Sequence, residues 1–139
     1  MISRAEAVTA FVDRFITEPF QWGIETDCAG RVCWYLDLID RLPDDWRAGM
    51  ETPRTSQREA SFILKRLYRA ATFARAVSGA FTPVAPLNAL TGDLAGVPAP
   101  SKRDPAVGVV LASTVFVTGP HGLEPKPLTA ACAAWRVPN

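Results

Sequence analysis

The chain has 139 residues, of which 48% are hydrophobic and 21% are charged, and its formal net charge is +1. This composition is typical of a globular protein and excludes a disordered chain. The balanced charge gives no basic footprint for nucleic acid, and no apolar stretch is long enough to span a bilayer. The length indicates a single domain, residues 1–139, with one hydrophobic core.

The first 80 residues predict helices. Ser3 and Glu6 form a capping box in front of an apolar stripe at helical spacing, and Ser56 and Glu59 repeat this pattern. A polar stretch between the helices carries Trp46, which we expect to anchor it. The expected helices cover residues 3–17, 28–40, 56–68 and a short segment that ends at Gly79.

The second half of the chain predicts strands. Proline and glycine recur every few residues between 83 and 105, which ends the helical region. We expect strands over Ala106–Leu111 and Thr114–Thr118, another from Leu123 onward, and a helical turn with a last strand within residues 128–137. Residues 90–139 are therefore mainly strands. The class is α+β, with N-terminal helices packed on a C-terminal antiparallel sheet.

The chain contains three cysteines, Cys28, Cys33 and Cys132. An odd number without a secretory signal predicts thiols outside disulfides, in a protein made in a cytoplasm. His121 is the only histidine, so a metal site would lack ligands, and no metal or other cofactor is expected. Cys33 and Cys132 are interpreted as core residues.

Cys28 is the strongest candidate for chemistry. It follows a loop that ends in Asp27, a natural helix cap, and it opens an apolar helix. The positive end of a helix dipole favours the thiolate form of a cysteine, which is the nucleophilic form. The alternative is a buried cysteine that acts as a small hydrophobic residue.

Two groups of residues suggest a family. Trp22-Gly23 and Asp27-Cys28-Ala29-Gly30 resemble the nucleophile segment of NlpC-type papain-like cysteine peptidases. Gly92-Asp93-Leu94 and Ala106-Val107-Gly108-Val109 resemble two later motifs, with Ala106 where those enzymes have the catalytic histidine. The resemblance implies a papain-like fold and an ancestral activity on the stem peptides of bacterial cell walls.

The whole chain also resembles a family of small phage and prophage proteins related to those peptidases. The resemblance is carried by Pro19 to Gly23, Asp27-Cys28, the turn from Gly119 to Leu123, and Ala134 to Val137. It implies a virion protein from a tail-tip or baseplate region, made in the host cytoplasm and incorporated in the tail. The implied partners are other phage tail proteins and, for an active enzyme, peptidoglycan.

The candidate catalytic residues are Cys28 as nucleophile, His121 as base and Thr118 as an orienting residue. If the two strands before His121 form a hairpin, His121 returns near Ala106, although its Gly-Pro-His-Gly context is typical of a surface turn. Two functions stay open: a catalytically degenerate structural or adaptor protein, and an active cysteine peptidase or amidase. No phosphate loop or dinucleotide motif favours a third class, a thiol-transfer or small-molecule enzyme.

Several other residues have ordinary structural interpretations. Asp93 is expected to start a strand, and Trp22 and Trp135 are expected to anchor the core or line a groove. Lys65, Arg66 and Arg69 are interpreted as a solvated helix face.

Overall fold

The protein is described by a computed structural model that covers residues 2–23, 28–99 and 104–139. Within these residues the chain forms five α-helices: α1 (Arg4–Phe15), α2 (Cys28–Leu38), α3 (Arg47–Glu51), α4 (Gln57–Arg66) and α5 (Phe73–Ala80). It also forms three short 3-10 helices: η1 (Asp44–Trp46), η2 (Pro86–Asn88) and η3 (Leu128–Ala130).

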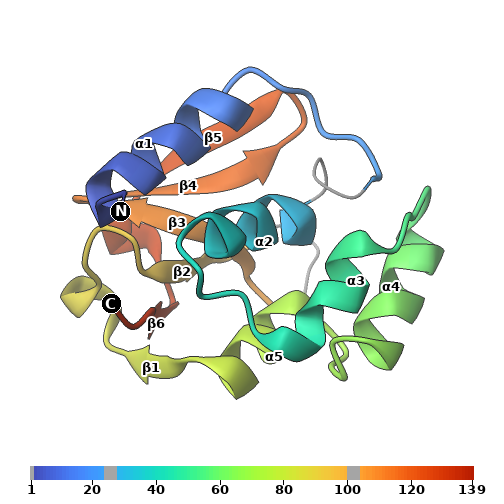
Figure 1. Ribbon diagram of the computed structural model, residues 1–139. Helices are drawn as coiled ribbons and strands as arrows, with labels where there is room; N and C mark the ends of the chain where they lie inside the picture. Colours follow the sequence, from blue (N-terminus) through green and yellow to red (C-terminus); the bar gives the residue numbers. More distant parts are fainter. Residues whose placement is uncertain (1, 24–27, 100–103) are drawn as a thin grey trace.

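The described strands form one six-stranded antiparallel sheet in the order β1-β6-β2-β3-β4-β5. The strands are β1 (Thr82–Val84), β2 (Leu94–Val97), β3 (Ala106–Leu111), β4 (Thr114–Gly119), β5 (Gly122–Pro127) and β6 (Ala133–Arg136). Helices therefore precede most of the sheet in the chain, and the predicted α+β class is confirmed. Figure 1 shows α1 and α2 lying across one face of the sheet, over β3 and its neighbours.

Local capping explains where the helices begin. The Ser3 hydroxyl accepts a hydrogen bond from the Glu6 amide at 3.1 Å, and the Ser56 hydroxyl accepts one from the Glu59 amide at 3.2 Å. Ser3 and Ser56 therefore cap the starts of these helices, as the sequence predicted. In α1 the apolar stripe faces the core, with Val8, Phe11 and Phe15 fully or almost fully buried.

The two faces of the sheet have different cores. On the helical face, side chains from β3 such as Val107 and Val109 pack against the main core with the helices. On the opposite face a smaller apolar cluster gathers Val110 and Val115, covered by Ala89 and Leu128. Because side chains alternate along a strand, one short sheet supports both layers.

Both edges of the sheet contain proline. Among the described strands, β1 carries Pro83 and pairs only with β6, while β5 carries Pro125 and Pro127 and pairs only with β4. Proline has no amide hydrogen for a ladder and is tolerated mainly on edge strands. The prolines therefore discourage further strand pairing at either edge.

Two sequence interpretations are corrected by the structure. Cys132, expected in the core, is exposed in the connection that precedes β6. Arg69, expected on a helix face with Lys65 and Arg66, lies beyond the end of α4 in the left-handed region, at φ 57°. In contrast, Cys33 and Trp46 are buried as expected.

Tyr35 ties α2 to the sheet. Its side chain is fully buried, and its hydroxyl donates a hydrogen bond to the Gly92 carbonyl oxygen at 2.7 Å. Burial raises the pKa of Tyr35 to about 12, although the nearby positive charge of Arg4 acts in the opposite direction. The neutral phenol is thus the form that the fold favours.

This pKa shift predicts a loss of stability at high pH. An unfolded tyrosine ionises near pH 10, whereas folded Tyr35 keeps its proton to about pH 12. The stabilisation is complete below pH 10 and should be lost between about pH 10 and 12, by roughly 2 kcal/mol. Urea titrations across this range check it, with Tyr35→Phe as the control. If the free energy of unfolding fell equally with pH in the wild type and in Tyr35→Phe, the loss of stability would not come from Tyr35.

Candidate functional site

Cys28 is the first residue of α2, and its side chain is exposed. The expectation that this thiol stands at a helix N-terminus is therefore confirmed, and the alternative of a buried Cys28 is wrong. Asp27, expected to cap the helix, lies outside the described residues. Cys33, five residues further along α2, is fully buried, and its sulfur lies 3.4 Å from the Tyr68 hydroxyl oxygen.

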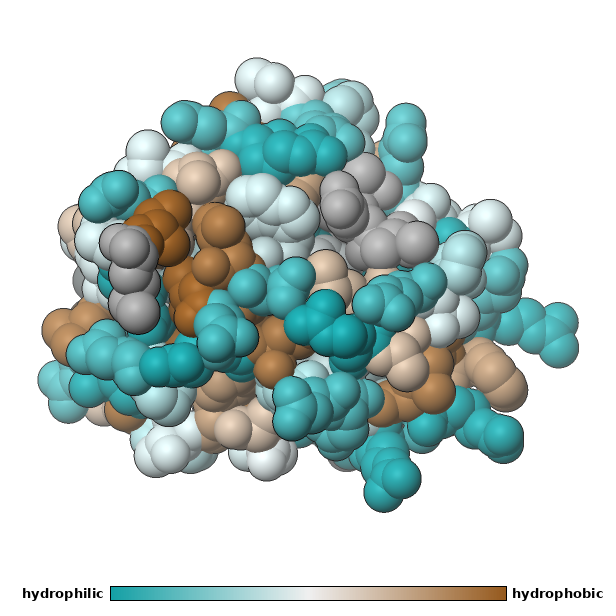
Figure 2. All heavy atoms as spheres, in the orientation of Figure 1, coloured by the Kyte–Doolittle hydropathy of each residue, from teal (hydrophilic) through white to brown (hydrophobic). Residues whose placement is uncertain are grey.

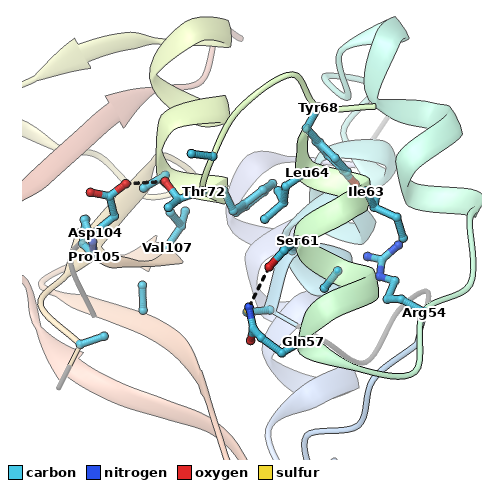
Figure 3. Close-up of a pocket in the computed structure, with 18 of the residues that line it drawn as sticks. Arg54, Gln57, Ser61, Ile63, Leu64, Tyr68, Thr72, Asp104, Pro105 and Val107 are labelled. Carbon is cyan, nitrogen blue, oxygen red and sulfur yellow. Dashed lines mark hydrogen bonds between the residues drawn. The ribbon is translucent and has the colours of Figure 1, made fainter. Parts of the chain in front are cut away.

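Cys28 lies at the wall of a cavity of about 260 Å³. The cavity is formed between the start of α2, α4, the start of α5 and the start of β3. Figure 3 shows Ile63 and Leu64 of α4 on one side, and Pro105 and Val107 at the start of β3 on the other. The lining is mostly apolar, which is typical of a pocket for an apolar group of a ligand or partner.

Polar groups are few and lie around this cavity. On α4, the Gln57 amide nitrogen lies 3.3 Å from the Ser61 hydroxyl oxygen. Opposite, Asp104 accepts hydrogen bonds from the Thr72 hydroxyl and from Arg75. Each of these polar groups at the cavity therefore has a hydrogen-bond partner within the protein.

Ala106 lines the same cavity as Cys28. It is the first residue of β3 and pairs with Val97 of β2. A methyl group neither accepts nor donates a proton, so this position supplies no general acid or base. The structure thus brings Cys28 and Ala106 to one cavity, as the sequence motifs suggested.

The other two candidates, His121 and Thr118, are not among the described residues that line the cavity. His121 is exposed in the turn between β4 and β5, where the preceding Pro120 carbonyl accepts a hydrogen bond from the Phe20 amide at 3.1 Å. Thr118 is half-buried in β4. The hairpin of β3 and β4 forms as expected, yet neither side chain is among the described residues that line the cavity.

Arg31 holds the chain at residues 18–19, after the end of α1. Its side chain is fully buried, donates hydrogen bonds to the carbonyl oxygens of Glu18 (2.8 Å) and Pro19 (3.1 Å), and lies over the Phe15 ring. Arg54 lies between α3 and α4, and its buried guanidinium donates a hydrogen bond to the Gly49 carbonyl oxygen at 2.7 Å. Sequence reasoning missed both, since a buried arginine leaves no periodic signal.

The remaining singled-out residues have structural positions. Asp93 directly precedes β2, is 2% exposed, and accepts hydrogen bonds from three groups, so it fixes the chain at the start of this strand. Trp135 is buried, and its indole nitrogen donates to the Ser78 hydroxyl at 3.1 Å. Trp22 lines the cavity.

The described residues hold no group of three or more His, Cys, Asp or Glu side chains placed to bind a metal ion. Over the same residues, none of the helices has the length and apolar character needed to cross a membrane. At the site itself, the exposed thiol of Cys28 lies beside a mostly apolar cavity.

Comparison with protein families gives a match over nearly the whole chain. The model of a family described as "Domain of unknown function (DUF6950)" matches residues 3–137. The chain belongs to this family. No curated protein and no solved structure matches the chain. Because the match covers both Cys28 and Ala106, the cavity lies within the family domain.

Alkylation kinetics test the position of Cys28. We expect iodoacetamide to modify Cys28 up to about fivefold faster than Cys132, because both are exposed but only Cys28 begins a helix. Buried Cys33 should stay unmodified in the native protein. Mass spectrometry of digested samples over time measures each rate. Equal or faster modification of Cys132 would show that the helix start does not activate Cys28.

Proposed function

We propose that the chain is a catalytically degenerate relative of NlpC-type papain-like cysteine peptidases that serves as a structural or adaptor protein of a phage or prophage tail. The α+β order supports this proposal, as does a cysteine at the start of a helix packed on an antiparallel sheet. The motifs from Trp22 to Gly30 and from Ala106 to Val109 support the relationship.

One observation supports the proposed loss of catalytic activity. Cys28 and Ala106 line one cavity, and His121, the only histidine of the chain, is exposed in a distant segment of the sequence and is not among the described lining residues. Cleavage of an amide needs a group that protonates the leaving amine. General acid–base catalysis contributes on the order of 10²–10⁴ in rate, and the members of a catalytic unit depend on one another.

The apolar cavity suits a binding role. An open, mostly apolar hollow beside an exposed thiol can accept an apolar side chain of a neighbouring protein without any proton transfer. In this proposal the protein is made in the host cytoplasm and then joins other proteins of the tail tip or baseplate.

Purified particles test the structural role. We expect mass spectrometry to find this chain in tails of a phage that encodes it, at a fixed copy number relative to other tail proteins. Its presence only in the lysate, with none in washed particles, would overturn this role.

An active cysteine peptidase or amidase is the second candidate. The exposure of Cys28 at the start of α2 favours it, because this is where a thiolate nucleophile is needed. Its substrate would be the stem peptides of peptidoglycan. The two candidates differ in whether Cys28 is required for release of such peptides.

A further inference from the structure

A second cavity lies away from Cys28, on the side of the protein where η1, the end of α5 and the C-terminal Pro138 meet. It has a volume of about 500 Å³. Its wall includes three buried aromatic residues, Trp46, Tyr68 and Phe81, which also pack on one another. Figure 2 shows hydrophilic side chains interspersed with apolar ones along the lower part of the face that carries α3, α4 and α5.

Three arginines from three segments line this cavity: Arg41 after α2, Arg69 after α4, and Arg75 on α5. The only acidic side chain among the described lining residues is Asp45. Guanidinium groups are suited to paired hydrogen bonds with a carboxylate or phosphate. The cavity thus combines an aromatic floor with an excess of positive charge.

The three arginines are not equally neutralised. Arg75 pairs with Asp104, at 3.0 Å between its Nε and a carboxylate oxygen. Arg41 donates to the carbonyl oxygens of Pro138 and Asp40, which carry no net charge. Arg69 is exposed and makes no hydrogen bond or ion pair with any residue that the structure describes. Two guanidinium charges therefore remain for a ligand.

Arg69 also occupies a costly backbone conformation. Its φ of 57° lies in the left-handed region, where helices commonly end with glycine because a side chain is strained there. Strained residues that persist in a fold are concentrated at functional sites. An arginine at this position places a charge at the cavity at some cost to stability.

We propose that this cavity binds an acidic segment of a partner protein, with carboxylates on Arg41 and Arg69 and an apolar side chain against the aromatic floor. Two guanidinium groups at a single cavity suit a short acidic peptide, whereas nucleic acid is bound along a longer run of basic residues. This site is separate from Cys28 and does not depend on the role proposed there.

Nuclear magnetic resonance with a defined probe tests the site. The probe is an acetylated, amidated hexapeptide of sequence DELEDF, titrated into the isotope-labelled full chain at low salt. We expect saturable shifts of the Arg41 and Arg69 side-chain signals and of the Trp46 indole signal, with a Kd of ~0.1–1 mM. The matched peptide NQLNQF should cause none. Shifts spread over surface arginines such as Arg14 and Arg58, or no shifts at all, would overturn the proposal.

Substitution of Arg69 separates binding from folding. We expect Arg69→Gly to weaken peptide binding about tenfold while raising Tm by about 3 °C, because glycine relieves the backbone strain. Arg69→Gln should weaken binding equally and keep the strain, and Arg66→Gln, which removes a charge from α4, should bind normally. Unchanged binding by both Arg69 variants, or tighter binding of a single-stranded oligothymidine than of the peptide, would contradict the site. Cys28→Ala should bind as the wild type does.

Discussion

Asp93→Ala should destabilise the protein by about 3 kcal/mol, because it removes the acceptor of three hydrogen bonds. One oxygen of Asp93 accepts from the Leu90 amide and from Arg136 Nε, each at 2.8 Å, and the other accepts from the Val137 amide at 3.0 Å. The carboxylate therefore joins the turn before β2 to the end of β6. Alanine would leave backbone amides without an acceptor in a buried place.

Urea unfolding of Asp93→Ala measures this loss. Asp37→Ala is the matched control, because the Asp37 carboxylate also pairs with an arginine, Arg47, but both side chains are about half exposed. The control should lose less than ~1 kcal/mol. Asp93→Asn keeps one acceptor oxygen and should fall between the two. If Asp93→Ala and Asp37→Ala proved equally stable, Asp93 would not be the anchor of this strand.

Arg31→Ala should cost about 3 kcal/mol, since it empties a buried space and leaves two carbonyl oxygens without their donor. These carbonyls belong to Glu18 and Pro19, at the start of the loop that leads to Cys28. We also expect the Phe20 amide, which donates to the Pro120 carbonyl, to exchange its hydrogen at least tenfold faster. The loop would open locally before the core unfolds.

Hydrogen exchange and urea unfolding on three variants resolve the role of Arg31. Arg14→Ala is the control, because Arg14 lies over the same Phe15 ring but on the surface, and it should lose less than ~1 kcal/mol. Arg31→Met keeps most of the volume and should recover stability without restoring slow exchange at Phe20. Slow exchange at Phe20 in Arg31→Ala would mean that the loop is held by other contacts.

The sequence predicted the elements whose signals are local. The N-cap residues Ser3 and Ser56 start α1 and α4, and the β-branched and aromatic run of β4 follows the turn after β3. The final helical turn and strand, η3 and β6, also formed as expected. Each of these patterns depends on residues within a few positions of one another.

Elements that depend on distant partners were missed. β1 contains Pro83 and is a strand because Thr82 and Val84 pair with β6, which lies some 50 residues later in the chain. The short helix α3 lies in a stretch that the sequence predicts only as polar. Arg69 was placed on a helix face because periodicity cannot show that α4 ends at Arg66 and that the backbone then turns to positive φ.

The candidate site was predicted in part. Cys28 and Ala106 come from motifs far apart in the sequence, and both line one cavity. Ile63 and Leu64 line the opposite wall of the cavity. The sequence predicts them only as part of the apolar face of a helix, because periodicity identifies that face but not the residues that it contacts. The exposure of Cys132 was missed for a related reason: free cysteines are usually buried, and only tertiary structure shows the exception.

Release of stem peptides from purified cell walls tests the loss of catalysis most directly. Wild-type protein and Cys28→Ala, each confirmed as folded, are incubated with peptidoglycan, and soluble peptides are quantified by mass spectrometry. We expect the same background release from both, because His121, the only histidine of the chain, is not among the described residues that line the cavity with Cys28. Release by the wild type at least tenfold above Cys28→Ala would contradict it and identify a working peptidase.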